Sequence, residues 1–475
     1  MNQSTYHVPY IYEKLQMDKT ENSKHSNPQI SRLQMPPIRV KVPGSKSITN
    51  RALLLATLAK GQSTLRGVLF SDDSRHFLKC VQALGFDTTV DEKNCVITVN
   101  GQGGEVPLKE ANQYVGSAGT AARFLTAYLG VSHGTYHMDA SEQMRKRPMA
   151  PLLHSLKELG CEIVYPELTA PEPTAPDQSG TNSNTAPCNH EGYFPFDLHS
   201  HGFGKNSISI DINHSSQFLS ALLIASCLSE HDFTIEVKGT HGMSYIEMTC
   251  KMMEQFGVRV EKPASHHFLT KAGQAYQALD YQIEPDVSAA CYFYALAPLL
   301  GIPVLVEHVH FDSLQGDVAF LHILEQLGCT VSDTPDGIIV RGSASGSFHG
   351  IEADMAACSD QAITLAAIAP FADSPTTITG IGHIRFQECN RIQAIVTELT
   401  KMGIHCEESE HSITIYPGIP KPSLVETYDD HRMAMGFSLI GLRSAGIVIN
   451  NPCCCSKTFE NYFEVLEQVI GKLCN

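Results

Sequence analysis

The sequence has no C-x-x-C pair and no excess of positive charge, and both absences argue against whole classes of protein. Its fifteen cysteines are scattered, so they show neither the paired spacing of a structural zinc site nor a disulfide framework. Lys and Arg number 34 against 50 Asp and Glu, which gives a formal net charge of −16. We therefore predict no metal site and no nucleic-acid partner.

The first residues also lack the basic and then apolar pattern of a secretory signal peptide. Together with the unpaired cysteines, this favours a reduced, cytoplasmic location. One uncharged stretch, residues 289–306, has the length of a short membrane span. Pro298, Gly301 and Pro303 interrupt it where a spanning helix would have to continue, so we predict a buried helix, a turn and a buried strand.

A polar cluster that opens an apolar helix occurs six times along the chain. The first residues of these clusters are Ser45, Ser117, Ser215, Asp286, Asp360 and Asp430. Their spacings are 72, 98, 71, 74 and 70 residues. A second marker, a helix that ends in glycine before a short strand, has the same period, with glycines at 85, 160, 257, 328 and 403. These glycines are placed to adopt the left-handed conformation at helix C-termini.

Each repeat also carries a strand after its first helix, seen clearly in five of the six. These strands are predicted at residues 63–68, 134–139, 233–239, 303–309 and 376–381. Strands and helices that alternate in this way predict α/β units whose sheets are covered by helices. Six units of this size favour two domains of three repeats over one closed ring.

The one long spacing is explained by residues 166–190, which are rich in Pro, Thr, Ser and Asn and contain a single leucine. We predict a mobile surface loop there, because such a segment buries too little apolar surface to offset its ordering entropy. Residues 1–35 are predicted to form a weakly ordered extension for similar reasons.

The recurrent Ser, Thr, Gly and Gln at helix starts indicate anion binding. The first turn of a helix presents free N–H groups and the positive end of the helix dipole. Lys46, Arg51 and Arg123 lie near these starts. Helix capping alone is the alternative at any single serine. Further cations cluster at residues 143–148. Residues 385–391 are predicted to be helical, with a Glu and an Arg three residues apart on one face. For these two residues, a surface ion pair is the alternative to a role in binding.

Eight motifs follow one another in a characteristic order between about residue 38 and residue 470. They are PGSKSITNRALLLATLAKG, SAGTAARF, RKRP, SSQFLSALL, EPDVSAACYF, SLQGD, YDDHRMAM and SKTFENYF. Together they resemble the 5-enolpyruvylshikimate-3-phosphate (EPSP) synthase family. The resemblance implies a two-domain inside-out α/β barrel, with three βαβαββ repeats in each domain and the active site in the cleft. Residues 36–44 and 284–475 would form the C-terminal domain and residues 45–283 the N-terminal domain.

The resemblance implies transfer of the enolpyruvyl group of phosphoenolpyruvate to the 5-hydroxyl of shikimate 3-phosphate, with release of phosphate. This is a step of the shikimate pathway toward chorismate and the aromatic amino acids. It implies a monomer that needs no metal or organic cofactor and no membrane, with the two substrates as its partners. Two alternatives stay open: an enzyme such as the UDP-N-acetylglucosamine enolpyruvyl transferase, which Ser47 and Arg51 disfavour, and a catalytically impaired homologue that still binds the anions.

The family's functional residues are carried over to this sequence one by one. Proton transfer would use Asp360 and Glu388, assisted by Lys46 and His431. Shikimate 3-phosphate would contact Lys46, Ser47, Arg51, Ser215, Ser216, Gln217, Ser244, Asp360 and Gln387. Phosphoenolpyruvate would contact Lys46, Gly119, Arg147, Gln217, Arg391, Arg432 and Lys457.

Several positions depart from the family's pattern. Its K-E-[ST]-D-R motif here reads Gln387-Glu388-Cys389-Asn390-Arg391, so neutral amides replace a lysine that meets the reacting hydroxyl and an aspartate that orients the arginine. The asparagine expected four residues before that lysine is His383, and Ser117 and Gln143 replace an asparagine and an arginine. The serine of the family's S-x-P-Y motif is displaced or lost in GTHGMSYIE, residues 239–247. We therefore predict the family's fold with slow turnover.

Overall fold

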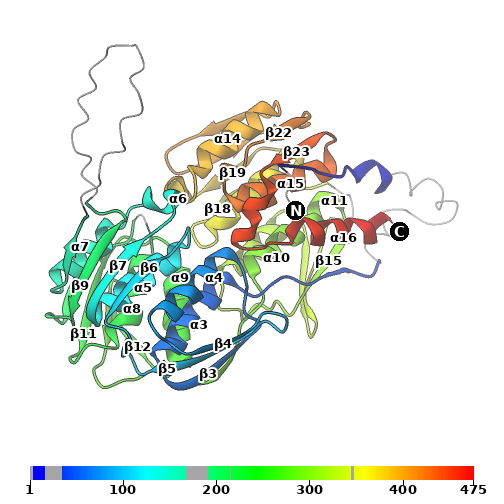
Figure 1. The fold of residues 1–475 in the computed structure, drawn as a ribbon. Coiled ribbons are helices and arrows are strands. Elements are labelled where there is room, and N and C mark those ends of the chain that lie inside the picture. The colour runs from blue at the N-terminus through cyan, green and yellow to red at the C-terminus, as the bar shows by residue number, and fades with distance from the viewer. Residues whose placement is uncertain (1–3, 16–34, 167–190, 214, 344–346, 475) are drawn as a thin grey trace, which may run out of the picture.

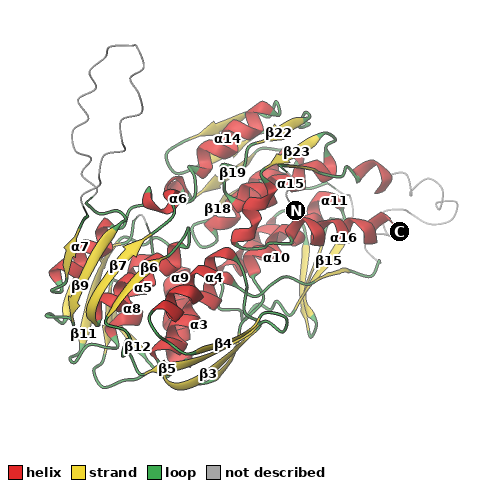
Figure 2. Ribbon diagram, viewed as in Figure 1, coloured by secondary structure: helices red, strands yellow, loops and turns green. Residues whose placement is uncertain are grey.

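The structure, a computed structural model, describes residues 4–15, 35–166, 191–213, 215–343 and 347–474. Strands and helices alternate along the chain, and the strands form six small sheets (Figures 1 and 2). The predicted surface loop at 166–190 lies, apart from residue 166, outside the described residues, as do residues 16–34 of the predicted extension. Within the described ranges, no helix has the length and apolar character needed to cross a bilayer.

The first three sheets and the helices that pack on them are formed by residues 46–282. Their strands are β3 (Lys60–Arg66), β4 (Thr88–Asp91), β5 (Val96–Gln102), β6 (Glu110–Tyr114), β7 (His133–Asp139), β8 (Glu162–Val164), β9 (Phe196–His201), β10 (Ser207–Asp211), β11 (Phe233–Lys238), β12 (Val260–Ala264), β13 (His267–Thr270) and β14 (Asp280–Gln282). Their helices are α3 (Lys46–Leu58), α4 (Asp72–Ala83), α5 (Gly119–Val131), α6 (Glu142–Arg145), α7 (Ala150–Glu158), α8 (Gln217–Ser226) and α9 (Met243–Gln255).

The other three sheets use the two ends of the chain. Their strands are β1 (Thr5–His7), β2 (Ile38–Val40), β15 (Pro303–Glu307), β16 (Thr330–Thr334), β17 (Gly337–Arg341), β18 (Glu352–Asp354), β19 (Thr376–Thr379), β20 (Cys406–Glu408), β21 (Ile413–Ile415), β22 (Ser423–Val425) and β23 (Ile447–Asn450). Their α-helices are α10 (Val287–Tyr294), α11 (Leu296–Leu300), α12 (Ala319–Gln326), α13 (Ala362–Ile368), α14 (Arg391–Lys401), α15 (His431–Arg443) and α16 (Tyr462–Cys474). Short 3-10 helices are η1 (Gly316–Val318), η2 (Ser359–Gln361), η3 (Ala369–Phe371), η4 (Gly382–Phe386) and η5 (Pro452–Lys457).

Five of the six sheets share one strand pattern. Each begins with a parallel pair and continues with two antiparallel strands: β14-β3-β5-β4, β6-β7-β9-β8, β10-β11-β13-β12, β2-β15-β17-β16 and β18-β19-β21-β20. The predicted strands correspond to β3, β7, β11, β15 and β19. The five glycines predicted at helix ends all have positive φ, between 80° and 107°. The predicted repeat is therefore confirmed.

Helices occupy the middle of each half, and the sheets lie outside them (Figure 2). Every residue of α5 is buried, as is every residue of α8 after Gln217. In the other half, α15 is buried from His431 to Leu442. The inside-out arrangement is thus confirmed. Because these helices are buried on all sides, their sequences are mostly apolar and show no polar face. The stretch at residues 289–306 forms α10, α11 and β15, as predicted, with a left-handed turn at Gly301.

The described residues form two hydrophobic cores, one of buried side chains between residues 48 and 283 and the other of buried side chains at 6–15, 40–42 and between 287 and 470. The chain passes between them twice, and the two crossing segments are hydrogen-bonded to each other. The amide of Ser45 donates to the carbonyl of Glu284, and the amide of Asp286 donates to the carbonyl of Pro43, both at 2.8 Å. A side chain at Gly44 would overlap the carbonyl oxygen of Gly67, so the close approach requires glycine.

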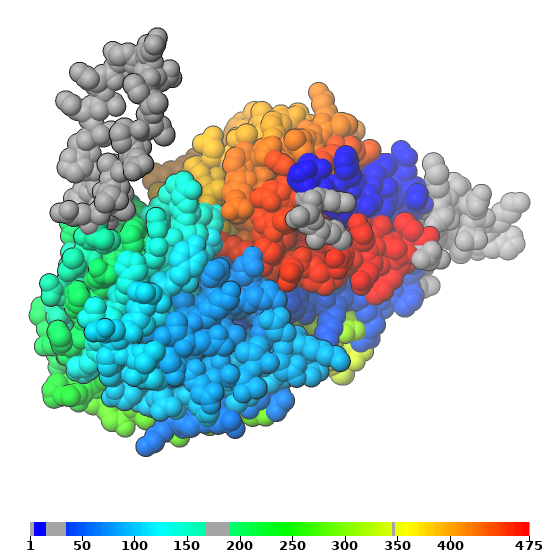
Figure 3. Space-filling model, viewed as in Figure 1, coloured from blue at the N-terminus to red at the C-terminus, as the bar shows by residue number. Residues whose placement is uncertain are grey.

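Residues 4–15 are part of the fold, which corrects the prediction that all of residues 1–35 form a weakly ordered extension. β1 pairs antiparallel with β23 and completes the sixth sheet, β1-β23-β22. In each of the other five sheets, the strand in the position of β1 comes from the same repeat as the strand it pairs with. Figure 3 shows this N-terminal segment against the orange and red C-terminal half. Its anchors in that core are Tyr6, Val8, Ile11 and Leu15. A three-residue strand with spaced anchors has too little pattern to be recognised from sequence.

Candidate active site

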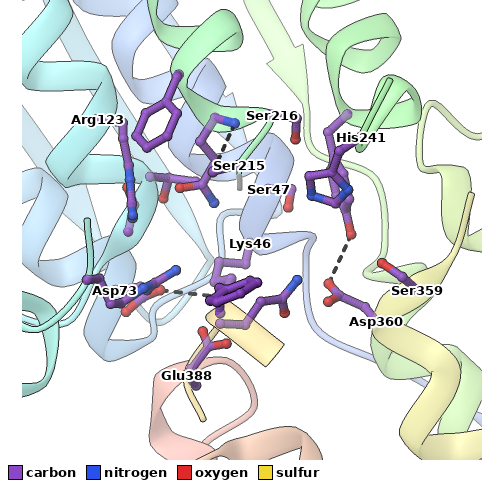
Figure 4. Close-up of a pocket in the computed structure, with 18 of the residues that line it drawn as sticks. Lys46, Ser47, Asp73, Arg123, Ser215, Ser216, His241, Ser359, Asp360 and Glu388 are labelled. Atoms are coloured by element: carbon purple, nitrogen blue, oxygen red, sulfur yellow. Dashed lines mark hydrogen bonds and ion pairs between the residues drawn. The ribbon is translucent and has the colours of Figure 1, made fainter. Parts of the chain in front are cut away.

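A pocket between the two halves gathers the first residues of several helices (Figure 4). α3, α5 and α8 enter it from one half, and η2, α14 and α15 enter it from the other. All of these starts except that of α14 are polar clusters that recur through the sequence, so the repeat places one helix start after another at the same cavity. The remaining cluster stands just behind it, where Asp286 accepts a hydrogen bond from the amide of Lys46 at 3.1 Å.

Most of the predicted site residues meet in this pocket. Its lining includes Lys46, Ser47, Arg51, Gly119, Arg147, Ser215, Ser216, Gln217, Asp360, Gln387, Glu388, Arg391, His431 and Arg432. Lys457 lies behind the lining, with its Nζ atom 3.3 Å from Oε1 of Glu388. Ser244 is the exception, because it does not line this pocket and its Oγ atom donates to the carbonyl of Ala357 at 3.1 Å.

The pocket carries an excess of positive charge inside an acidic protein. Its lining holds six cationic side chains, Lys46, Arg51, Arg123, Arg147, Arg391 and Arg432, against the three carboxylates of Asp73, Asp360 and Glu388. A cleft with this balance concentrates anions whatever the net charge of the whole chain. Two anionic ligands, or one with several charges, would balance it.

Two of these cations stand next to each other beside a glycine. A Cβ atom on Gly119 would lie 2.6 Å from Nη1 of Arg123 and 3.0 Å from Nη1 of Arg147. Among the described residues, neither guanidinium forms an ion pair, and Arg123 donates to the carbonyls of Gly119 and Pro148 instead. Burial, followed by repulsion from Arg147, lowers the pKa of Arg123 well below its ordinary value. Such a pair is suited to an anion that bridges both groups.

Arg391 connects the carboxylates of the other half. Its Nε atom donates to Asp430 at 2.7 Å, its Nη1 atom to Asp360 at 2.9 Å and its Nη2 atom to Glu388 at 2.8 Å. Asp360 also accepts from Nη2 of Arg432 at 2.6 Å and from the hydroxyl of Tyr245 at 2.9 Å. Burial acts to raise the pKa of Asp360, but attraction to Arg432 and Arg391 outweighs it and lowers the pKa to about 2. Asp360 is therefore ionised at neutral pH.

Glu388 and His431 also line the pocket, and they differ in charge: Glu388 is ionised and His431 is neutral. Burial acts to raise the pKa of Glu388, but Lys457, Arg391 and Arg147 together hold it well below its ordinary value. Burial and the charges of Lys46 and Arg432 hold the pKa of His431 far below its ordinary value, so this ring is neutral. Neither of its nitrogens has a hydrogen-bond partner in the described part of the chain. A buried polar ring of this kind is available to a ligand.

The predicted helix over residues 385–391 does not form. η4 ends at Phe386, and α14 begins only at Arg391, because Asn390 caps it by accepting from the amide of Gln393 at 3.2 Å. The irregular residues between them turn Glu388 into the pocket, and Arg391 is only 1% exposed. The surface ion-pair interpretation is therefore wrong for this segment. Gln387 turns inward as well and accepts a hydrogen bond from Nη1 of Arg391.

The pocket also contains residues that the sequence did not single out for the site. Asp73, at the start of α4, forms an ion pair with Nζ of Lys46 at 3.5 Å, as Figure 4 shows. Tyr245 binds Asp360, and His241, Ser359 and Phe386 complete the wall. The helix start of α4 was a signal for Asp73, since it follows a strand as the other helix starts do. In the described residues, no group of three His, Cys, Asp or Glu side chains is arranged to hold a metal ion.

Comparison with known proteins identifies relatives over nearly the whole chain. The family model of EPSP synthase (3-phosphoshikimate 1-carboxyvinyltransferase) matches residues 37–182 and 178–466. The 3-phosphoshikimate 1-carboxyvinyltransferase of Trichormus variabilis is 43% identical over 434 residues, which cover 91% of this chain and 96% of that protein. The chloroplastic 3-phosphoshikimate 1-carboxyvinyltransferase of Arabidopsis thaliana is 39% identical over 472 residues, covering 95% of this chain and 87% of that protein. The solved EPSP synthase of Acinetobacter baumannii has a TM-score of 0.71 at 25% identity, covering 91% of this chain and 96% of that one.

Proposed function

The chain belongs to the EPSP synthase family, and on that basis we propose that it transfers the enolpyruvyl group of phosphoenolpyruvate to the 5-hydroxyl of shikimate 3-phosphate, with release of phosphate. The observation that carries the proposal is the charge of the pocket. Six cations and three carboxylates from both halves face one cavity, which fits two polyanions and the proton transfers between them.

We assign shikimate 3-phosphate to the wall built by residues 45–283. Ser215 and Ser216 stand at the start of α8, where the free N–H groups and the helix dipole favour a phosphate. Ser47 faces the same cavity, and Arg51 lies beneath it with its Nε atom bound to Thr249 at 2.8 Å. Gln217 and Gln387 are proposed to contact the hydroxyl groups.

We assign phosphoenolpyruvate to the cations on both sides of Lys46. Arg147, beside Gly119, and Arg432 would bind its phosphate and carboxylate groups, because a guanidinium donates two parallel hydrogen bonds to either. Arg391 and Lys457 complete this set through the network around Glu388. Lys46 lies between Asp73 and Asp360 in Figure 4. We propose that from there its ammonium contacts both substrates.

The reaction first adds the hydroxyl oxygen to C2 of phosphoenolpyruvate and a proton to C3, and then loses phosphate and a C3 proton. Asp360 is ionised and so accepts the proton of the 5-hydroxyl. Glu388 starts ionised, but a bound anion competes for Lys457, Arg391 and Arg147 and raises the pKa of Glu388, so that it takes up a proton and delivers it to C3. His431 is neutral and offers a ring N–H to the tetrahedral intermediate. Lys46 balances the charge on the bridging oxygen.

The proposal includes two domains, residues 36–44 with 284–475 and residues 45–283, that act as a monomer in the cytoplasm. The two separate cores and the hydrogen-bonded crossing at Gly44 support that division. Because the ligand sets come from both cores, closing the domains would exclude water from the two substrates.

A second candidate, an impaired homologue that binds both anions but reacts slowly, is favoured by Gln387. This amide is bound to Arg391 and carries no charge at the position where the family has a lysine.

Phosphate release tests the proposal and separates it from the second candidate. We expect purified protein to release phosphate when both substrates are present and to release none with either substrate alone. Binding of both substrates without phosphate release would support the impaired homologue, and binding of neither would contradict both assignments. Asp360→Asn serves as the control, because it removes the proposed base and should abolish release.

A further inference from the structure

The turn before α9 contains the departure from the family's S-x-P-Y motif. The serine of that motif is displaced or lost, and Ser244 donates to the carbonyl of Ala357 outside the pocket. Gly242 has φ 64° and ψ 33°, and a Cβ atom there would lie 2.5 Å from Oγ and 2.8 Å from Cβ of Ser216. A serine at position 242 would therefore be strained and would collide with Ser216.

His241, the residue before this glycine, is the side chain of the turn that faces the cavity. It lines the same pocket as Ser215 and Ser216, and Figure 4 shows its ring on the side where Ser216 and Ser47 lie. The ring also packs against His383 across the cleft, with 3.7 Å between the ring centroids and a tilt of 39° between the ring planes. His383 is held in turn by a hydrogen bond to Oγ of Ser359 at 2.8 Å.

We propose that His241 is a substrate-binding residue that contacts the phosphate group of shikimate 3-phosphate and thereby selects the phosphorylated substrate over shikimate. This inference rests on the proposed function and adds to it a residue outside the family's usual set.

Three features of the site carry it. The starts of α8 and α9 meet at Ser216 and Gly242, so two helix dipoles favour an anion at this point. Three of the five N–H groups of the Arg51 guanidinium are bound within the protein, to Thr249, to the carbonyl of Ser47 and to the carbonyl of Tyr245. At most two therefore remain for a ligand, and a further donor beside the serines would strengthen the binding of a phosphate there. An imidazole donates an N–H to a phosphate oxygen when neutral and adds a positive charge when protonated.

The neighbouring ring of His383 adds no charge of its own. Burial, followed by repulsion from His241, lowers the pKa of His383 to about 3, so His383 stays neutral. The contact with His383 also holds the ring of His241 on the wall of the pocket, so that ordering the ring on binding costs little side-chain entropy.

Calorimetry with His241→Ala, and with Ser244→Ala as the matched control from the same turn, tests this assignment. We expect His241→Ala to weaken shikimate 3-phosphate binding at least about tenfold while the affinity for shikimate, which lacks the phosphate, changes less than about twofold. Ser244→Ala should leave both affinities unchanged. His241→Gln, which keeps an N–H donor, should recover part of the loss.

Equal weakening of shikimate and shikimate 3-phosphate in His241→Ala would overturn the assignment, since the variant would then act through the shape of the turn. Unchanged shikimate 3-phosphate affinity in a protein that releases phosphate with both substrates would also overturn it and would leave the proposed function intact. Failure of the unaltered protein to bind shikimate 3-phosphate would instead contradict the proposed function itself.

Discussion

Gln387 accepts a hydrogen bond from Nη1 of Arg391, the same nitrogen that donates to Asp360 at 2.9 Å. The amide is thus fixed beside the proposed base, at the position where the family has a lysine. A neutral amide can bind a hydroxyl but cannot supply a labile proton or a positive charge to the developing negative charge. We therefore expect this contact to slow turnover.

Replacing Gln387 with lysine should increase the turnover rate. We expect Gln387→Lys to raise kcat at least about tenfold in steady-state phosphate release, because one charged contact to the transition state is commonly worth about 2 to 4 kcal/mol. Gln393→Lys is the control, since it makes the same change at an exposed position of α14 outside the pocket lining, and it should change kcat less than about twofold. An equal or lower kcat in Gln387→Lys, with both substrates still bound, would mean that the site works through the amide.

Gly119 should control how the site accommodates phosphoenolpyruvate and its mimic glyphosate. We expect glyphosate to compete with phosphoenolpyruvate. The added methyl of Gly119→Ala would lie 2.6 Å from Arg123 and 3.0 Å from Arg147, so it must displace both guanidinium groups. We expect the KM for phosphoenolpyruvate and the inhibition constant of glyphosate both to rise, with the affinity for shikimate 3-phosphate preserved. An unchanged inhibition constant would place glyphosate elsewhere.

Binding of the two substrates should be coupled, because their proposed ligands come from two cores joined by the crossing at Gly44. The first anion should favour the closed arrangement, and the second should then bind more tightly, by about 5- to 150-fold. Calorimetry of phosphoenolpyruvate or glyphosate with and without shikimate 3-phosphate measures this factor. Identical affinities in the two titrations would show that closure is not shared between the substrates.

His383 should make the protein less stable in acid. Its pKa is lowered from 6.5 to about 3 in the folded protein, by burial and then by His241. Between these two pH values the unfolded chain therefore binds a proton at this histidine and the folded protein does not. The contribution of neutral His383 to the free energy of unfolding is fully present above pH 6.5. It decreases as the pH falls toward 3, by at most about 1.4 kcal/mol per pH unit. We expect the free energy of unfolding of His383→Asn, measured in denaturant, to fall less steeply between pH 6.5 and 4. Identical slopes would show that the histidine titrates normally in the folded state.

The fold could be predicted because its signals are local and repeated. Gly85 and Gly257 end helices with φ of 89° and 91°, and the same short pattern of apolar residue, glycine and strand predicted both. β1 could not be predicted in this way, because its stability comes from pairing with β23 at the far end of the chain rather than from its own three residues.

In the site, too, the residues predicted from sequence belong to local patterns, and the residues that were missed are placed by contacts between distant segments. Lys46, Ser216 and Arg432 could be predicted from helix-start patterns and from the family resemblance, and all three line the pocket. Tyr245 could not, since its bond to Asp360 joins residues 115 apart in sequence. The spacing of Glu388 and Arg391 is that of a helix, but the cap at Asn390 delays α14 and buries both side chains in the site. Tertiary contacts overrode the local pattern there.

The most direct test of the central claim is the product formed from both substrates in deuterium oxide. Protonation of C3 makes a transient methyl group that later loses one hydrogen. We therefore predict an enol ether of shikimate 3-phosphate with deuterium in its vinyl methylene, seen by mass spectrometry and NMR. Asp360→Asn should give no such product. Phosphate release without the enol ether, or an enol ether without deuterium, would contradict the proposed mechanism.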